Sequence, residues 1–365
     1  MKKAYRQVVI LLIGCFWWGA LIAQEHQQVY TVSAAGVEEP YELVLVYDSA
    51  QFPAYFFRDI FTPVCLDSVC KPVRIKLFWD LLGNYLRYEV PPDEPLTKLN
   101  HEEFAPEDHE RLQEILSNEQ SLLKDFKMEE LVDRNTQKLS DSVDAVTGAT
   151  KNTVKSEVIE GALYTCYTLW HLAHGTVVNE IQKLTREKLD NNMLHHFLGD
   201  TNFHYVYFAL NEVMDTAGII HPDFLPDVLS VLAGDNVFAA RYVWQRIDLR
   251  YFAEREQQER LWDIFERTPY TQQLALLKRM SALVLDPHVL NDMASGLSKL
   301  NPTLFKQVLH VIAAQDSLPS FTQEKLLTYL TSADQEKSRL VYETLKNHSN
   351  LGEPLKKQLS LYKKP

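Results

Sequence analysis

The residues with the clearest chemical potential form one short segment, Asp144-Ala145-Val146-Thr147-Gly148-Ala149-Thr150. Thr150 supplies a hydroxyl, the group that a phosphoester bond requires, and Gly148 and Ala149 are small enough to let a bulky nucleotide reach the backbone. The apolar periodicity of the residues that follow predicts a helix beginning beside Thr150, where free N–H groups and the helix dipole favour a phosphate. The alternative interpretation is a Thr-Gly turn that caps this helix, with Asp144 solvated.

This segment resembles the flavinylation motif of the FMN-binding domain family, which includes the small flavin subunits of sodium-pumping NADH:quinone oxidoreductases and of Rnf-type complexes. The family pattern is Asp, two residues, Ser or Thr, then Gly, Ala and Thr. Each fixed position is present, as Asp144, Thr147, Gly148, Ala149 and Thr150. The resemblance implies covalent FMN, joined to Thr150 as a phosphoester by a flavin transferase that uses FAD, with Asp144 and the Gly-Ala pair as part of what that enzyme recognises.

The resemblance covers about residues 60–175 and implies an electron carrier, in which FMN performs the redox chemistry and the protein supplies attachment and tuning. A membrane or periplasmic redox protein would then donate or accept the electrons. The sequence has no Ser/His/Asp ordering, no phosphate-binding Gly-rich loop and no His-Glu-x-x-His segment. An oxidoreductase with its own small substrate is therefore the less favoured alternative.

The N-terminal residues predict an exported protein. Three basic residues among the first six precede an apolar run over residues 8–23, and polar residues follow, as in a secretory signal peptide cleaved after Ala23. This run is shorter than the roughly 20 residues that span a bilayer. An uncleaved anchor and a lipoprotein lipidated at Cys15 are the alternatives. Each of them places the chain in the periplasm or on the extracytoplasmic side of a membrane.

Net charge limits the classes of partner, and the cysteines indicate a candidate disulfide. The formal net charge is −12 and the sequence has no basic stripe, so a nucleic-acid partner is not expected. Export permits disulfides, and Cys65 and Cys70 are the candidate pair, which would close a small structural loop. A redox-active pair is an alternative, and a metal pair is less favoured because no second Cys/His pair accompanies it. No metal site is predicted, and Cys166 is expected to be buried in a helix.

The segment over residues 24–175 predicts a small α+β domain after the signal peptide. We expect a loose lead-in over residues 24–39, then strands, then helices. Gly83 begins the turn of a predicted hairpin, and Gly175 is the expected C-cap of the last helix. The predicted strands are 41–47, 73–79 and 85–90, and the predicted helices are 107–123 and 151–174.

Several other side chains within this domain are weaker candidates. Three aromatic residues of the hairpin, Trp79, Tyr85 and Tyr88, could stack on a flavin ring, but packing of the sheet is the default expectation. The loop over residues 96–104 could line a pocket or simply pack. The helix also carries two histidines three residues apart, which could share a face, although a metal site needs more ligands than this pair.

Residues 176–365 predict an all-α region with an internal repeat. Apolar stretches end at similar positions, and the steps between these positions are 34, 33, 32 and 33 residues. A period of this size with two helices in each unit predicts a HEAT-like α-solenoid of helical hairpins, which could dock a partner. The alternative to electron transfer is thus an exported scaffold with a degenerate or non-covalent flavin domain. The five positions are Leu198, Leu232, Phe265, Leu297 and Leu330.

Overall fold

The computed structural model describes residues 26–33, 39–64, 71–98, 101–131 and 153–362. By their contacts the chain divides into two compact units, an N-terminal unit that ends at Lys188 and a C-terminal unit that begins at Leu189. The N-terminal unit combines an antiparallel sheet with helices, whereas the described part of the C-terminal unit consists almost entirely of helices. The α+β layout predicted from the sequence is confirmed.

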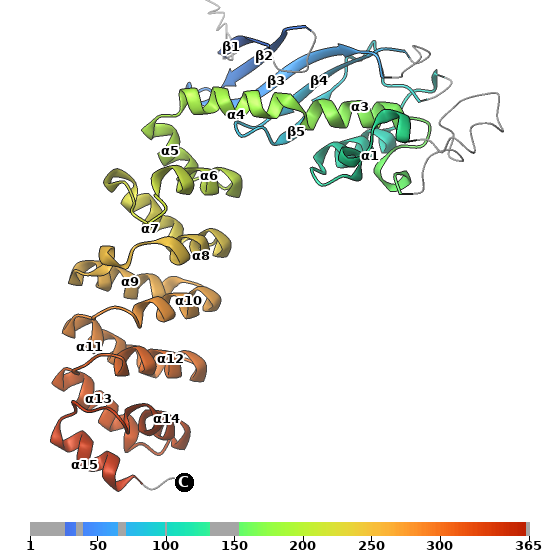
Figure 1. Cartoon of the computed structure of the whole chain (residues 1–365). Helices are drawn as coiled ribbons and strands as arrows, with labels where there is room; N and C mark the ends of the chain where they lie inside the picture. The colour runs from blue at the N-terminus through green and yellow to red at the C-terminus, as the bar shows by residue number, and fades with distance from the viewer. Residues whose placement is uncertain (1–25, 34–38, 65–70, 99–100, 132–152, 363–365) are drawn as a thin grey trace, which may run out of the picture. The chain divides into compact units, whose positions relative to one another are not determined.

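The sheet is a five-stranded antiparallel meander in which each strand pairs with the next along the chain (Figure 1). The sequence predicts β2 at its observed bounds and the hairpin of β4 and β5. It assigns no strand to β3, and the loose lead-in predicted before residue 40 is wrong where β1 forms. The strands are β1 (Gln27–Val32), β2 (Tyr41–Tyr47), β3 (Pro53–Thr62), β4 (Val73–Trp79) and β5 (Tyr85–Glu89).

One face of the sheet forms the core of the N-terminal unit. Leu45 lies opposite Phe56 in the strand register, and Phe56 lies opposite Trp79, so the three side chains share a face. Each of them is at most 1% exposed. Burial of such large apolar side chains is the main stabilising contribution to this layer.

Two consecutive helices, α3 (Leu163–His174) and α4 (Thr176–Lys188), lie along the buried face of the sheet (Figure 1). Trp79 Nε1 donates a hydrogen bond to the Ala173 carbonyl at 2.7 Å, which satisfies a polar group inside the core. The two helices meet at Gly175, the C-cap of α3, as the sequence predicts. The sheet and helices therefore form two layers around one core.

Shorter elements complete the N-terminal unit. The first of them, α1 (Pro106–Ser117), buries the apolar face that the sequence predicts for it and packs against β5 and α3. It ends earlier than the predicted helix over 107–123, and a 3-10 turn, η2 (Leu122–Asp125), follows it. Two more 3-10 turns belong to this unit, η3 (Met128–Glu130) and η4 (Lys155–Glu157).

The helices of the C-terminal unit form two rows, because each helix contacts the helix two places further along the chain. The odd row runs from α5 to α15 and the even row from α6 to α14 (Figure 1). The odd-row helices are α5 (Asn191–Leu198), α7 (Leu225–Ala233), α9 (Arg255–Arg267), α11 (Pro287–Gly296), α13 (Ser320–Leu330) and α15 (Glu353–Leu361). The even-row helices are α6 (Phe203–Val213), α8 (Val237–Arg246), α10 (Tyr270–Met280), α12 (Pro302–Ala313) and α14 (Gln335–Leu345). Three 3-10 turns join them, η5 (Pro222–Phe224), η6 (Leu249–Phe252) and η7 (Leu297–Lys299).

The five apolar positions that define the sequence repeat occupy equivalent places in the structure. Each lies in the last turn of an odd-row helix or, for Leu297, directly after it, and each is at most 5% exposed. A buried apolar residue is required there because the end of each odd-row helix packs against the next hairpin. These residues are Leu198, Leu232, Phe265, Leu297 and Leu330.

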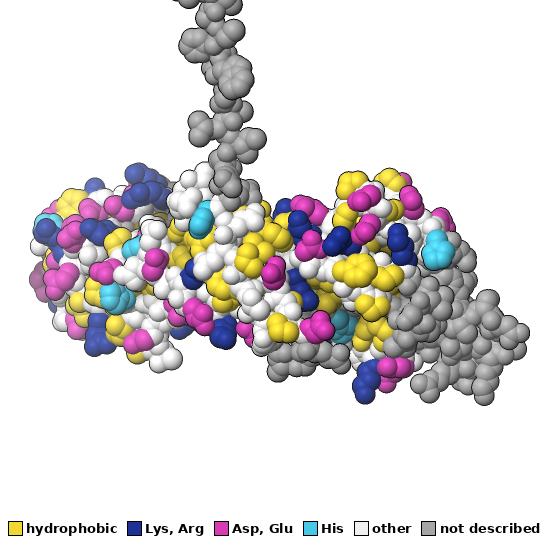
Figure 2. Space-filling view, turned by 90° about the horizontal axis from the view of Figure 1, so that it is seen from above, with side chains coloured by type: hydrophobic (Ala, Val, Ile, Leu, Met, Phe, Trp, Pro, Cys, Tyr) yellow, Lys and Arg dark blue, Asp and Glu magenta, His cyan; other side chains and the backbone are white. Residues whose placement is uncertain are grey.

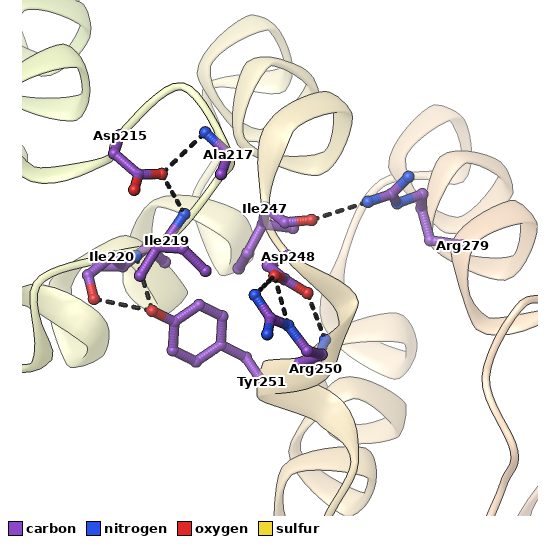
Figure 3. Close-up of polar contacts among 9 residues, drawn as sticks. All are labelled: Asp215, Ala217, Ile219, Ile220, Ile247, Asp248, Arg250, Tyr251 and Arg279. Atoms are coloured by element: carbon purple, nitrogen blue, oxygen red, sulfur yellow. Dashed lines mark hydrogen bonds and ion pairs between the residues drawn. The ribbon is translucent and has the colours of Figure 1, made fainter.

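Hydrogen bonds connect equivalent places in successive hairpins. Arg279 Nη2 donates to the Ile247 carbonyl at 2.8 Å, across 32 residues of sequence (Figure 3). Tyr251 Oη donates to the Ile220 carbonyl at 2.8 Å, across 31 residues (Figure 3). The Ile247 carbonyl lies at the end of α8, where backbone carbonyls lack partners within the helix, and Arg279 satisfies it from the next hairpin. The Ile220 carbonyl lies in the connection before η5, and Tyr251 satisfies it in the same way.

Candidate functional site

The predicted flavin attachment segment, residues 144–150, lies outside the described residues, and so do Cys65 and Cys70. The described chain resumes at Thr153, three residues after Thr150 in the sequence. The candidate site therefore consists of the described segment that begins at Thr153, the residues that contact it and the side chains around it.

The chain that follows the motif is attached to α1, η2 and α3. Val154 is fully buried, and Ser121 Oγ donates a hydrogen bond to Glu157 Oε2 at 2.6 Å. Ile159 N donates to Cys166 Sγ at 3.4 Å. One apolar anchor and two hydrogen bonds thus fix the chain within nine residues of Thr150.

The helix predicted over residues 151–174 is wrong in its first half. The described chain forms only the 3-10 turn η4 before Val158, whose backbone is extended. Gly161 then adopts φ +77°, in the left-handed region, and α3 begins at Leu163. A left-handed residue interrupts the i to i−4 hydrogen bonds of an α-helix. The expectation that the N-terminus of a long helix stabilises a phosphate on Thr150 is therefore not supported by the described chain.

The two histidines of α3 bind backbone rather than metal. His171 Nε2 lies 3.2 Å from the Leu123 carbonyl oxygen, and His174 Nε2 lies 2.8 Å from that of Leu116. In the neutral tautomer protonated at Nε2, each ring donates to its carbonyl. Burial lowers the pKa of both imidazoles, which favours this neutral form. Among the described residues, no group of three His, Cys, Asp or Glu side chains is placed to hold a metal ion.

The hairpin aromatics proposed as flavin contacts all have structural partners. Trp79 is fully buried, and Tyr85 Oη donates to Gln113 Oε1 at 2.8 Å. Tyr88 Oη lies 2.7 Å from His109 Nδ1. Burial raises the pKa of both tyrosines above the usual value, so both phenols stay protonated at neutral pH. Trp79 joins the sheet to α3 and the two tyrosines join it to α1, in agreement with the default expectation.

The two described ends of the loop over residues 96–104 pack against each other. Leu96 and Phe104 are buried, and the Phe104 backbone N–H donates to the Leu96 carbonyl at 2.9 Å. Lys98 Nζ lies 2.7 Å from Asp108 Oδ2, at the start of α1. This hydrogen bond raises the pKa of Lys98, so the lysine remains charged and paired. The described part of the loop supports α1, and His101 within it is exposed.

The other face of the sheet carries an aromatic cluster that the sequence prediction misses, because no strand was assigned to β3. Tyr55 and Phe57 lie 5.8 Å and 5.7 Å from Phe78, measured between ring centroids. The Arg87 guanidinium lies over Phe78, 3.6 Å from its centroid. Stacking of this kind stabilises the cation and the ring together. The strong alternation of β4, read together with the aromatic run in β3, could have indicated this second face.

Burial also defines the chemistry of the lone described thiol. Cys166 is fully buried in α3, as the sequence predicts, and burial raises the pKa of its thiol to about 12. A protonated, buried thiol is a poor nucleophile. Cys166 is therefore a packing residue.

The surface in one view is mixed in charge, and the described helices can be compared with the length that a membrane span requires. In the view of Figure 2, hydrophobic side chains lie between charged side chains of both signs, and neither sign forms a continuous surface. No helix in the described ranges is long and apolar enough to span a bilayer.

Comparison with known proteins found no match to a family model, to a curated protein or to a solved structure.

Proposed function

We propose that the chain is an exported electron-transfer flavoprotein that carries FMN covalently, as a phosphoester on Thr150. The observation that carries this proposal is the complete flavinylation pattern in residues 144–150. When bound, FMN supplies the one- and two-electron redox chemistry, and the chain supplies its attachment. A covalent link suits an exported protein, because a diffusible cofactor would be lost from it.

The described fold supports attachment near α1. Three residues of chain span at most about 11 Å, so a group linked to Thr150 would stay close to Thr153. From there the chain is held by the buried side chain of Val154 and by the Ser121–Glu157 hydrogen bond. A flavin tethered in this way would keep a limited range of positions relative to the sheet, which a carrier needs if electrons are to move between defined partners.

We also propose that the C-terminal unit is a HEAT-like α-solenoid with a partner-docking role. Support comes from the two rows of helices and from side-chain hydrogen bonds that recur after 31 to 33 residues. Such arrays expose long surfaces to partners. A membrane or periplasmic redox protein is the partner class that the flavin proposal requires, in addition to the FAD-dependent transferase.

In-gel fluorescence of denatured protein tests the flavin proposal. The chain is co-expressed with a flavin transferase and exported, and wild type is compared with Thr150→Val and Thr153→Val. We expect fluorescent bands for wild type and Thr153→Val and a dark band for Thr150→Val, because only the covalent link survives denaturation. Thr153 is an exposed threonine three residues away, so its variant controls for a general loss of hydroxyls.

The transferase must label a known target in the same cells. Dark bands for all three proteins under that condition would refute covalent FMN. A dark Thr153→Val band beside a fluorescent Thr150→Val band would show that the flavin is attached to Thr153, and the proposed attachment to Thr150 would then be wrong.

The regular two-row arrangement of the C-terminal unit favours a second candidate, an exported scaffold without a working flavin. The two candidates differ in what Thr150→Val does in the cell. A scaffold keeps its partners and its physiological role in this variant, whereas an electron carrier keeps its partners but loses electron transfer.

A further inference from the structure

Three neighbouring helices of the even row carry charge of one sign. α8 contacts α10, and α10 contacts α12. Their sequences contain five Lys or Arg residues and no Asp or Glu, although the whole chain has a formal net charge of −12. The linear sequence conceals this because acidic helices and loops separate the three segments. The five residues are Arg241, Arg246, Lys278, Arg279 and Lys306.

Two of the five cations serve the fold. Arg246 Nη2 lies 3.5 Å from the Asp215 carbonyl oxygen. Arg279 Nη2 donates to the Ile247 carbonyl at 2.8 Å, as Figure 3 shows. The other three are exposed, and none forms an ion pair with any residue that the structure describes. We call these three, Arg241, Lys278 and Lys306, the even-row basic surface.

The neighbouring odd-row helix shows the opposite arrangement. α9 also carries three arginines, but each one has an acidic partner four residues away on the same helix, at 3.3 Å, 2.8 Å and 3.5 Å. Local pairing largely cancels the charge of α9. The pairs are Arg255–Glu259, Arg260–Glu256 and Arg267–Asp263.

Exposed aromatic side chains accompany the unpaired cations. Phe238 is 74% exposed at the start of α8, and Tyr270 is 45% exposed at the start of α10. Phe238 precedes Arg241 by three residues, so the two side chains share a helix face. Aromatic residues and arginine are enriched at protein–protein interfaces and dominate their binding energy.

We propose that the even-row basic surface binds an acidic segment of another protein, with carboxylates opposite Arg241, Lys278 and Lys306 and apolar side chains against Phe238 and Tyr270. This inference builds on the proposed docking role of the C-terminal unit and does not depend on the flavin. Because α8 contacts α10 and α10 contacts α12, and adjacent helices pack with axes about 8–10 Å apart, one extended acidic segment can cross all three helices.

The chemistry favours a protein over other polyanions. A net charge of −12 repels an extended nucleic acid or a strongly anionic bilayer at long range. Binding to anionic lipid generally uses a denser group of about 4–8 basic residues. Three dispersed cations with aromatic neighbours instead suit a mixed acidic and apolar protein segment.

Fluorescence anisotropy of a labelled synthetic peptide of Asp, Glu and Leu tests the proposal with the full chain. The test variant is Arg241→Gln/Lys278→Gln/Lys306→Gln. The matched control is Arg255→Gln/Arg260→Gln/Arg267→Gln on α9, which removes the same number of charges. We expect about tenfold weaker binding for the test variant and less than about twofold for the control, because only the first set has free charges to offer.

The result should be the same in a Thr150→Val background, so failure of the flavin proposal would not affect it. Circular dichroism checks that the triple variants are folded; if the test variant is not, Lys278→Gln and Lys306→Gln must each weaken binding alone. Equal weakening by the test and control variants would overturn the proposal. Tighter binding to phosphatidylglycerol vesicles than to the peptide, lost in the test variant, would overturn the assignment of the partner.

Discussion

Gly218 occupies a position in the C-terminal unit that no other residue should tolerate, and Gly218→Ala therefore tests the described contact between hairpins. Its φ is +80°, in the left-handed region. A Cβ added there would lie 1.8 Å from the Arg246 carbonyl oxygen, which is a backbone atom of the next hairpin. The Gly218 carbonyl also accepts a hydrogen bond from Asp248 N at 3.0 Å.

The expected loss follows from these contacts. The left-handed conformation costs a residue with a Cβ about 1–2 kcal/mol. Moving the Arg246 carbonyl away would also break the Asp248–Gly218 hydrogen bond, at about 1 kcal/mol. We therefore expect Gly218→Ala to lower the free energy of unfolding by about 2–3 kcal/mol.

Gly199→Ala is the matched control. Gly199 lies at the end of α5 in the same unit, its φ is −92°, and an added Cβ would meet nothing closer than 3.7 Å. Urea unfolding followed by circular dichroism compares both variants with wild type. Hydrogen exchange at the Asp248 amide shows whether the loss is local. Equal midpoints for Gly218→Ala and Gly199→Ala would refute the described contact.

Three further predictions concern the N-terminal unit. Burial lowers the pKa of His171 and His174, so the unfolded chain binds their protons more readily than the folded chain. Stability should therefore be full above the unfolded pKa of about 6.5 and fall as pH drops towards the lowered folded values. Guanidinium unfolding at about pH 7.5 and about pH 5.5 should show this difference in wild type, and a smaller one when both histidines are Gln. In a variant that keeps Cys166 as its only cysteine, a thiol reagent should react at about pH 8 only after urea is added, because burial raises the thiol pKa to about 12. Trp79→Phe removes the donor to the Ala173 carbonyl and should lower the free energy of unfolding by about 2 kcal/mol, measured by urea unfolding.

Elements with one clear period could be predicted from the sequence. β4 alternates between buried apolar and polar residues from Val73 to Leu77, and its predicted bounds, Val73–Trp79, are confirmed. β3 was missed because Tyr55, Phe56 and Phe57 are consecutive aromatic residues, so no alternation is visible although the strand buries Phe56 on one face. Side chains on both faces of a sheet can be apolar when the second face forms a cluster of its own.

The even-row basic surface could not be predicted in the same way. Arg241 and Lys278 are 37 residues apart and Lys278 and Lys306 are 28 apart, and the acidic residues of α9 lie between the first two. Only the contacts of α8 with α10 and of α10 with α12 bring together the three helices that carry them. The expectation that the chain lacks a basic stripe is correct for the linear sequence and incomplete for the folded unit.

Loss of the predicted helix after the motif changes what must select Thr150. Thr147, Thr150 and Thr153 are equally spaced hydroxyls in one segment. A helix beginning beside Thr150 would have favoured a phosphate at that residue through its dipole, but α3 begins only at Leu163. Within the described residues, no α-helix N-terminus close to Thr150 distinguishes it from its neighbours. If FMN is attached there, selection belongs to the transferase and to the residues it reads around that threonine, so Gly148→Val should prevent labelling while leaving the hydroxyl of Thr150 in place.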